Sequence, residues 1–175
     1  EKVIFHDIPR VYDVGEPEIM KTIASFVARS PGMIVDFRQL AGGLGITHQT
    51  ASKYVKYMEK AFILRLLFNR RGSTVASSRK LKKAYMECTT LCTPFFDSEA
   101  EFLGIMPSLV ENAVCSSISA KSFMRDYYEV DFVHGKLPIE VKYQENPDIR
   151  NALKLTGRIR SPMLVVVSKS IEKAE

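Results

Sequence analysis

Three charged side chains in the second half of the chain have the types and the spacing of a metal-dependent hydrolytic site. Asp131 precedes a predicted turn at His134-Gly135, and Glu140 and Lys142 follow in a segment of alternating polarity. Residues two apart on a strand point to the same face, so Glu140 and Lys142 would lie together beside this hairpin. Carboxylate oxygens of this kind bind Mg²⁺ or Mn²⁺. Such a cation would polarise a phosphate and help to generate hydroxide, while Lys142 orients the water or stabilises charge.

A predicted helix offers this site one more carboxylate. The segment that starts at Ser108 is typical of a helix, and Glu111 would reach the site if that helix packs on the sheet. The candidate catalytic residues are therefore Glu111, Asp131, Glu140 and Lys142, and the three acids among them are the candidate metal ligands. The alternative is an ordinary strand surface, because cross-strand ion pairs are common and need no metal.

The positive charge of the chain is concentrated in one segment. The 175 residues include 25 Lys and Arg against 20 Asp and Glu. Eight of the basic residues and no acidic residue lie between Lys60 and Lys83, so the rest of the chain is net negative. A block of this kind is typical of a protein that binds a polyanion. The alternative is a solvated hairpin on which the charges are merely tolerated.

The elements before this block predict a helix-turn-helix. A helix opens at Glu16-Pro17 and stops at Ser30-Pro31-Gly32. Two shorter helices follow, joined by a tight turn at Gly45, with Asp36 and Thr47 as their N-terminal caps. Turn, caps and apolar spacing agree with one another, which favours the motif.

A basic hairpin after the motif predicts the wing of a winged helix. Residues 61–68 predict a strand, 69–72 a turn and 74–77 the returning strand. Winged helices place the second helix of the motif in the major groove of DNA. We therefore predict DNA contacts from the start of that helix and from the basic segment: His48, Gln49, Thr50, Lys53, Arg70, Arg71, Arg79 and Lys80. The alternative is a winged helix that binds only protein.

The second half of the chain predicts a small α/β domain. Strands over 123–132 and 137–143, a helix over 148–158 and an apolar strand over 163–167 follow one another. This order is typical of a small α/β sheet covered by helices. We place the boundary at residue 80, which gives a winged helix-turn-helix domain over 1–80 and an α/β domain over 81–175.

Composition bears on the compartment and on the partners. No stretch approaches the roughly 18 apolar residues of a membrane helix, so we expect no membrane partner. Cys88, Cys92 and Cys115 match neither a disulfide framework nor a zinc site, because no second ligand pair accompanies them. We therefore expect a reducing, cytoplasmic environment. The chain begins at Glu1 rather than Met, and we expect it to be a fragment of a longer protein.

Short motifs spread over nearly the whole chain carry a resemblance to a known family. The most specific pair is Glu129-Val130-Asp131-Phe132-Val133 with Ile139-Glu140-Val141-Lys142. The others are Asp7-Ile8-Pro9, Gly45-Ile46-Thr47-x-x-Thr50, Glu59-Lys60-Ala61-Phe62-Ile63-Leu64, Lys83-x-Tyr85, Val110-Glu111-Asn112-x-Val114 and Arg125. The chain resembles the C-terminal region of archaeal-type, prokaryotic AAA-family ATPases. It departs from that family at Cys88 and Thr90, which replace an Asp and a Gly, and near Ser108, where a Gly is missing.

The resemblance implies a winged helix joined to a domain that looks like the PD-(D/E)XK restriction-endonuclease fold. It matches Glu111 to the helix carboxylate, Asp131 to the central Asp, and Glu140 with Lys142 to the (D/E)XK pair. It also implies an ATPase domain N-terminal to this chain. ATP would bind only there, because this chain has no Gly-x-x-x-x-Gly-Lys-Ser/Thr loop.

Three functions are compatible with these observations. The first is a DNA-binding C-terminal module of an AAA-family ATPase that carries a nuclease-like domain. The second is an active Mg²⁺-dependent DNA nuclease. The third is a protein-interaction or oligomerisation module, in which the basic segment meets an acidic partner such as the ATPase domain or a second copy of the chain. A nuclease-like fold does not by itself establish cleavage.

Overall fold

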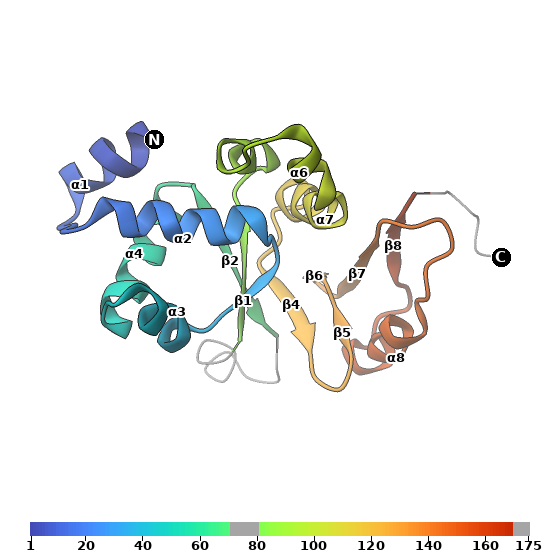
Figure 1. Cartoon of the computed structure of the whole chain (residues 1–175). Coiled ribbons are helices and arrows are strands. Elements are labelled where there is room, and N and C mark those ends of the chain that lie inside the picture. Colours follow the sequence, from blue (N-terminus) through green and yellow to red (C-terminus); the bar gives the residue numbers. More distant parts are fainter. Residues whose placement is uncertain (71–80, 170–175) are drawn as a thin grey trace.

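A computed structural model describes residues 1–70 and 81–169 of the chain (Figure 1). The fold is mixed α/β, which confirms the predicted class at this level. Helices α1 to α4 lie at one end of the molecule, and a small sheet with helix α8 lies at the other (Figure 1). None of the helices in the described segments is both long enough and apolar enough to span a membrane.

Helical segments open the chain. A π-helical turn at Val3–Asp7 runs into α1 at Ile8–Val11, and α2 follows at Pro17–Arg29. Pro17 is the first residue of α2, where its missing N–H breaks no hydrogen bond. The helix stops before Ser30-Pro31-Gly32, as predicted. Its inner face buries Met20, Ile23, Ala24, Val27 and Ala28.

Helices α3 (Phe37–Leu44) and α4 (His48–Lys60) form where the sequence predicts them. The Asp36 carboxylate caps α3 by accepting from two backbone N–H groups, at 2.8 and 3.2 Å. Gly45 ends α3 with a φ of 67°, a conformation that side-chain-bearing residues resist. The Thr47 hydroxyl caps α4 by accepting from the Thr50 N–H at 3.1 Å. Both predicted caps are confirmed.

A five-stranded sheet runs through the middle of the molecule (Figure 1). Strand β3 pairs antiparallel with both β1 and β2, and β2 pairs in parallel with β4. The order is β1-β3-β2-β4-β5, with the bounds Met33–Val35, Lys82–Met86, Leu64–Asn69, Ser122–Arg125 and Glu129–Val130.

The strand predicted over 61–68 begins later, at Leu64. Ala61 and Phe62 still donate their N–H groups to carbonyls of α4, and Phe62 takes a φ of 55°. These residues therefore close the helix instead of starting the strand. The return predicted at 74–77 lies outside the described residues, and the described strand that pairs antiparallel with β2 is β3.

A three-stranded sheet follows, with β6 (Phe132–His134), β7 (Leu137–Lys142) and β8 (Val165–Ser168). Strands β6 and β7 form an antiparallel hairpin, and β8 lies parallel to β7. Helix α8 (Arg150–Ile159) connects β7 to β8. The strands predicted over 137–143 and 163–167 and the helix predicted over 148–158 are therefore confirmed, with shifted ends. The strand predicted over 123–132 is divided into β4, β5 and the start of β6, and β4 and β5 belong to the five-stranded sheet.

The remaining helices pack beside the five-stranded sheet. A 3₁₀ segment at Thr89–Phe95 and α6 at Glu99–Gly104 lead to α7 at Met106–Ser117. Helix α7 contacts β3 and β7, over a core that includes Tyr85, Phe123 and Phe132. Because β3 joins strands from earlier in the chain, the sheet continues across residue 80. The domain boundary there stays a prediction.

Candidate functional site

The four predicted catalytic residues come from three elements that meet beside the central sheet. Glu111 lies on α7, Asp131 lies between β5 and β6, and Glu140 and Lys142 lie on β7. Phe132 pairs antiparallel with Ile139, so Asp131, the residue just before β6, lies opposite Glu140. The Asp131 carboxylate also accepts the Val141 N–H at 2.9 Å, which fixes it against β7.

A lysine that the charge pattern assigned to the basic segment links these acids. Lys83, on β3, is only 5% exposed. Its Nζ lies 2.6 Å from Glu129, 3.4 Å from Asp131 and 3.6 Å from Glu111. We predicted no site role for Lys83 or Glu129. The sequence signal for its burial is the apolar run that follows it, Ala84-Tyr85-Met86, which is typical of a buried strand.

Glu111 is held in place from three sides. The buried Asn112 carboxamide accepts from the Met86 N–H at 2.9 Å and donates to its C=O at 3.2 Å, which ties α7 to β3. The Tyr85 hydroxyl donates to Glu111 Oε1. Gly32 has a φ of 85°, and a Cβ there would lie 3.1 Å from Glu111 Oε1. The turn after α2 therefore closes on the site because residue 32 is Gly.

Glu111, Glu129, Asp131 and Glu140, together with Lys83 and Lys142, form an acidic cluster. Glu140 is the least satisfied carboxylate of this cluster. It is 5% exposed, and Lys142 Nζ lies 2.8 Å from its Oε1. Its Oε2 is buried and accepts no hydrogen bond from any described residue. Burial and the nearby Asp131 charge raise the pKa of Glu140 above its usual range.

Burial and neighbouring charges also shift the pKa values of Glu111, Lys83 and Lys142. Burial and the Asp131 charge raise the pKa of Glu111. Burial pulls the pKa of Lys83 down, but the charges of Glu111, Asp131 and Glu129 outweigh it and raise the pKa overall. The hydrogen bond to Glu140 raises the pKa of Lys142. Both lysines are therefore held as ammonium ions by their carboxylates.

The donor set suits a cation that needs few protein ligands. Within residues 1–70 and 81–169, no three His, Cys, Asp or Glu side chains are spaced to enclose a metal ion. Mg²⁺, however, is commonly bound by one or two carboxylates, with water and phosphate oxygens in its other positions. Asp131 and Glu140 are the carboxylates that could take this role, since the Oε2 of Glu140 has no hydrogen-bond partner among the described residues.

Helix α4 presents three of its four predicted DNA contacts to solvent. His48, Gln49 and Lys53 are exposed. Thr50 is half-buried, and its hydroxyl lies 2.9 Å from the Thr47 hydroxyl, so it belongs to the cap. Lys56 was not predicted as a contact, yet it is exposed and lies on the same helix face as Gln49 and Lys53.

The basic segment does not form one continuous exposed surface over its described part. Arg65 pairs with Glu87, Arg70 donates to the Gly135 carbonyl in the β6–β7 turn, and Lys82 lies over two aromatic rings. Lys83 is buried in the acidic cluster. The predicted contacts Arg71, Arg79 and Lys80 lie outside the described residues.

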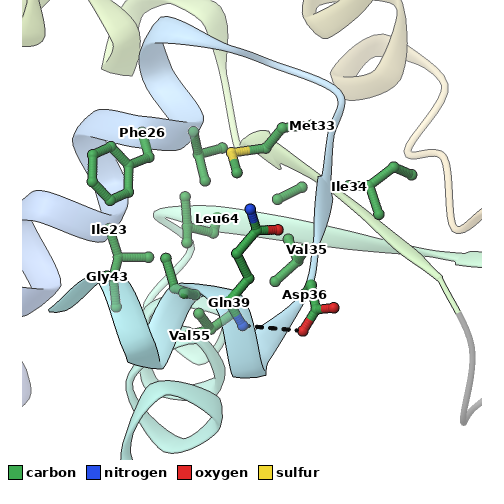
Figure 2. Close-up of a pocket in the computed structure, with 13 residues that line it drawn as sticks. Ile23, Phe26, Met33, Ile34, Val35, Asp36, Gln39, Gly43, Val55 and Leu64 are labelled. Carbon is green, nitrogen blue, oxygen red and sulfur yellow. Dashed lines mark hydrogen bonds between the residues drawn. The ribbon is translucent and has the colours of Figure 1, made fainter. Parts of the chain in front are cut away.

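A second candidate site is an apolar cavity of about 250 Å³ between α2, β1 and α3 (Figure 2). Figure 2 shows Phe26, Met33, Val35 and Leu64 around it, with the Gln39 side chain reaching among them from α3. Among the described residues, Asp36 is the one titratable residue that lines it, and its carboxylate already caps α3.

Comparison with known proteins gives one match. The sequence profile of a family described as a domain of unknown function (DUF8612) matches residues 1–92. No curated protein and no solved structure matches the chain. The matched segment includes α3, α4 and Lys83, whereas the four predicted catalytic residues lie beyond it.

Proposed function

The chain belongs to the family of the domain of unknown function DUF8612, and we propose that it is a DNA-binding module. The exposed face of α4 carries this proposal. Gln49, Lys53 and Lys56 project from it, and neither lysine pairs with a carboxylate among the described residues. Unpaired cations on a helix face are the usual contacts to DNA phosphates.

The order of the elements supports the same proposal. Helix α2, strand β1, helices α3 and α4, and strands β2 and β3 follow one another as in a winged helix. In that arrangement α4 would enter the major groove, where the Gln49 carboxamide suits an adenine edge and Lys53 suits a phosphate or a guanine. The caps at Asp36 and Thr47 would keep α3 and α4 in a fixed relative position.

We place this module in a larger ATPase on the basis of the family resemblance alone. In that setting the partner is the AAA-family ATPase domain of the same protein, and ATP binds to that domain. The three cysteines are free thiols, which supports a reducing, cytoplasmic compartment.

The test is DNA affinity with charge-reversed variants. Fluorescence anisotropy of a short labelled duplex should show binding that weakens steeply between about 50 and 200 mM salt. Lys53→Glu should weaken binding. Lys2→Glu is the matched control, because Lys2 is also exposed but belongs to neither α3 nor α4, and the N-terminus beside it lies on the other side of α2 from α3 (Figure 1). Equal losses in both variants, or no binding by the wild type, would contradict the proposal.

A second candidate function is metal-dependent cleavage of the bound DNA, which the Glu140 carboxylate favours. A buried carboxylate oxygen without a hydrogen bond is costly, and a cation would satisfy it. When bound, Mg²⁺ would act as a Lewis acid on the phosphate. Asp131 and Glu140 would hold it, and Lys142 would orient the Glu140 carboxylate through Oε1.

Cleavage is tested with supercoiled plasmid and Mg²⁺ or Mn²⁺ on one native gel. Nicking by the wild type that disappears in Glu140→Gln would support the nuclease. A mobility shift without nicking in both proteins would leave DNA binding as the function. Nicking that survives in Glu140→Gln would be assigned to a contaminant.

A further inference from the structure

The acidic cluster has two ends with different counter-ions. At one end, the buried Lys83 ammonium contacts Glu111, Glu129 and Asp131. At the other end, Lys142 contacts Glu140 through one oxygen only. The first end is therefore crowded around an internal cation, whereas the second keeps a free acceptor.

At the Lys83 end, the carboxylates already have counter-ions, so an additional cation would gain little there. A lysine ammonium has three N–H donors and no acceptor. Three carboxylates surround Lys83 Nζ within 3.6 Å, and Arg125 adds a further positive charge 3.3 Å from Glu129. The Lys83 side chain is 7% exposed, so solvent screens these contacts weakly.

The Glu140 end has the opposite character. Its side chain is also 7% exposed, but its Oε2 has no hydrogen-bond partner within the described part of the chain. The neighbouring Asp131 carboxylate lies at the boundary between both ends, since one oxygen faces Lys83 and the other accepts the Val141 N–H. An additional positive charge would be stabilised at this end and opposed at the other.

We propose that Lys83 takes the place of a second metal ion, so that the cluster binds one divalent cation, at Glu140 and Asp131. The proposal deepens the second candidate function, and it does not require DNA binding. Lys83 would keep Glu111 and Glu129 neutralised, and the free Oε2 of Glu140 would be the first ligand. Lys83 is then a positioning residue that sets the number of metal ions.

Mn²⁺ binding to the full chain without DNA tests this, with the free ion followed by electron paramagnetic resonance. The wild type should bind one Mn²⁺ per chain. Glu140→Gln should weaken that binding about 10-fold or more, whereas the matched variant Glu129→Gln should retain it. Lys83→Met should bind a second Mn²⁺, because the carboxylates it leaves need a new cation.

Three results would overturn the proposal: two Mn²⁺ per wild-type chain, none at all, or equal losses in Glu129→Gln and Glu140→Gln. Lys83→Met is interpreted only if its circular dichroism matches that of the wild type. If it does not fold, the wild-type stoichiometry and the difference between the two glutamine variants decide. Since no DNA is present, failure here is distinguishable from failure of the DNA-binding proposal.

Discussion

The exposed face of α4 and the acidic cluster use charge in opposite ways. On α4, Lys53 and Lys56 stand in solvent, and none of the described carboxylates pairs with them. In the cluster, Lys83 is 5% exposed and lies within 3.6 Å of three carboxylates. The first region keeps its charge available to a partner. In the second region, the charges pair with one another and connect β3 to α7 and β5.

This difference predicts that the two regions respond differently to substitution. Exposed charges contribute little to stability, because water and salt screen them. A buried ion pair is different, since removal of one partner leaves an uncompensated charge in the interior. Changes on α4 should therefore alter binding without unfolding, and changes at Lys83 should alter the fold first.

The largest expected effect on stability is at Lys83. Lys83→Met should lower the free energy of unfolding by about 3–5 kcal/mol, because three buried carboxylates lose their shared counter-ion. Lys53→Met is the matched control and should change it by less than about 0.5 kcal/mol. Urea denaturation of both variants measures the difference. Similar stability for the two would mean that the cluster is not held together by Lys83.

The largest expected effect on binding is at α4. In Lys53→Glu/Lys56→Glu, DNA affinity should fall for all sequences alike, because the contacts are to phosphates. The melting temperature should stay close to that of the wild type, since both side chains are exposed. Anisotropy titrations with two unrelated duplexes measure the loss. A loss confined to one duplex would instead indicate contacts to bases.

Two glycines near the α3–α4 turn should respond with opposite signs. Gly45→Ala should destabilise the fold by about 1–2 kcal/mol, because Gly45 has a φ of 67°. Gly43→Ala should stabilise it by roughly 0.5–1 kcal/mol, because Gly43 is helical and a Cβ there meets no atom. Thermal unfolding of the pair measures both. The same sign for the two would contradict the turn described here.

Removal of the α4 cap should lower the stability by a smaller amount, and it should also affect the DNA-facing residues in the first turn of the helix. Thr47→Ala should cost about 1 kcal/mol of stability, since the Thr50 N–H loses its acceptor. Thr47→Ser keeps a hydroxyl and should retain most of that stability. If the cap orders the first turn of α4, Thr47→Ala should also weaken DNA binding more than Thr47→Ser does. Equal affinities would show that the first turn does not depend on the cap.

Local sequence signals predicted the N-terminal helices well. The caps at Asp36 and Thr47 and the turn at Gly45 act over a few residues, so their effect can be read directly from the chain. The strand over 61–68 was placed too early, because apolar spacing cannot show that Ala61 and Phe62 continue the hydrogen bonds of α4. Strand β1, at Met33–Val35, was missed because three residues carry no periodicity.

The candidate acidic site was predictable only in part. The alternation of the predicted strand placed Glu140 and Lys142 together, and the predicted helix after Ser108 offered Glu111 as a further carboxylate. Lys83 was counted with the basic segment, because composition records charge but not burial. Its three partners come from α7, β5 and the residue before β6, and only the tertiary structure brings them to β3.

The salt dependence of DNA affinity tests most directly the claim that the two regions are separate. Wild type and Glu140→Gln should follow the same steep line of log affinity against log salt. Lys53→Glu/Lys56→Glu should give a line that is shallower by about two, one for each lost phosphate contact. A flat wild-type line, or a Glu140→Gln line as shallow as that of the double variant, would contradict the account.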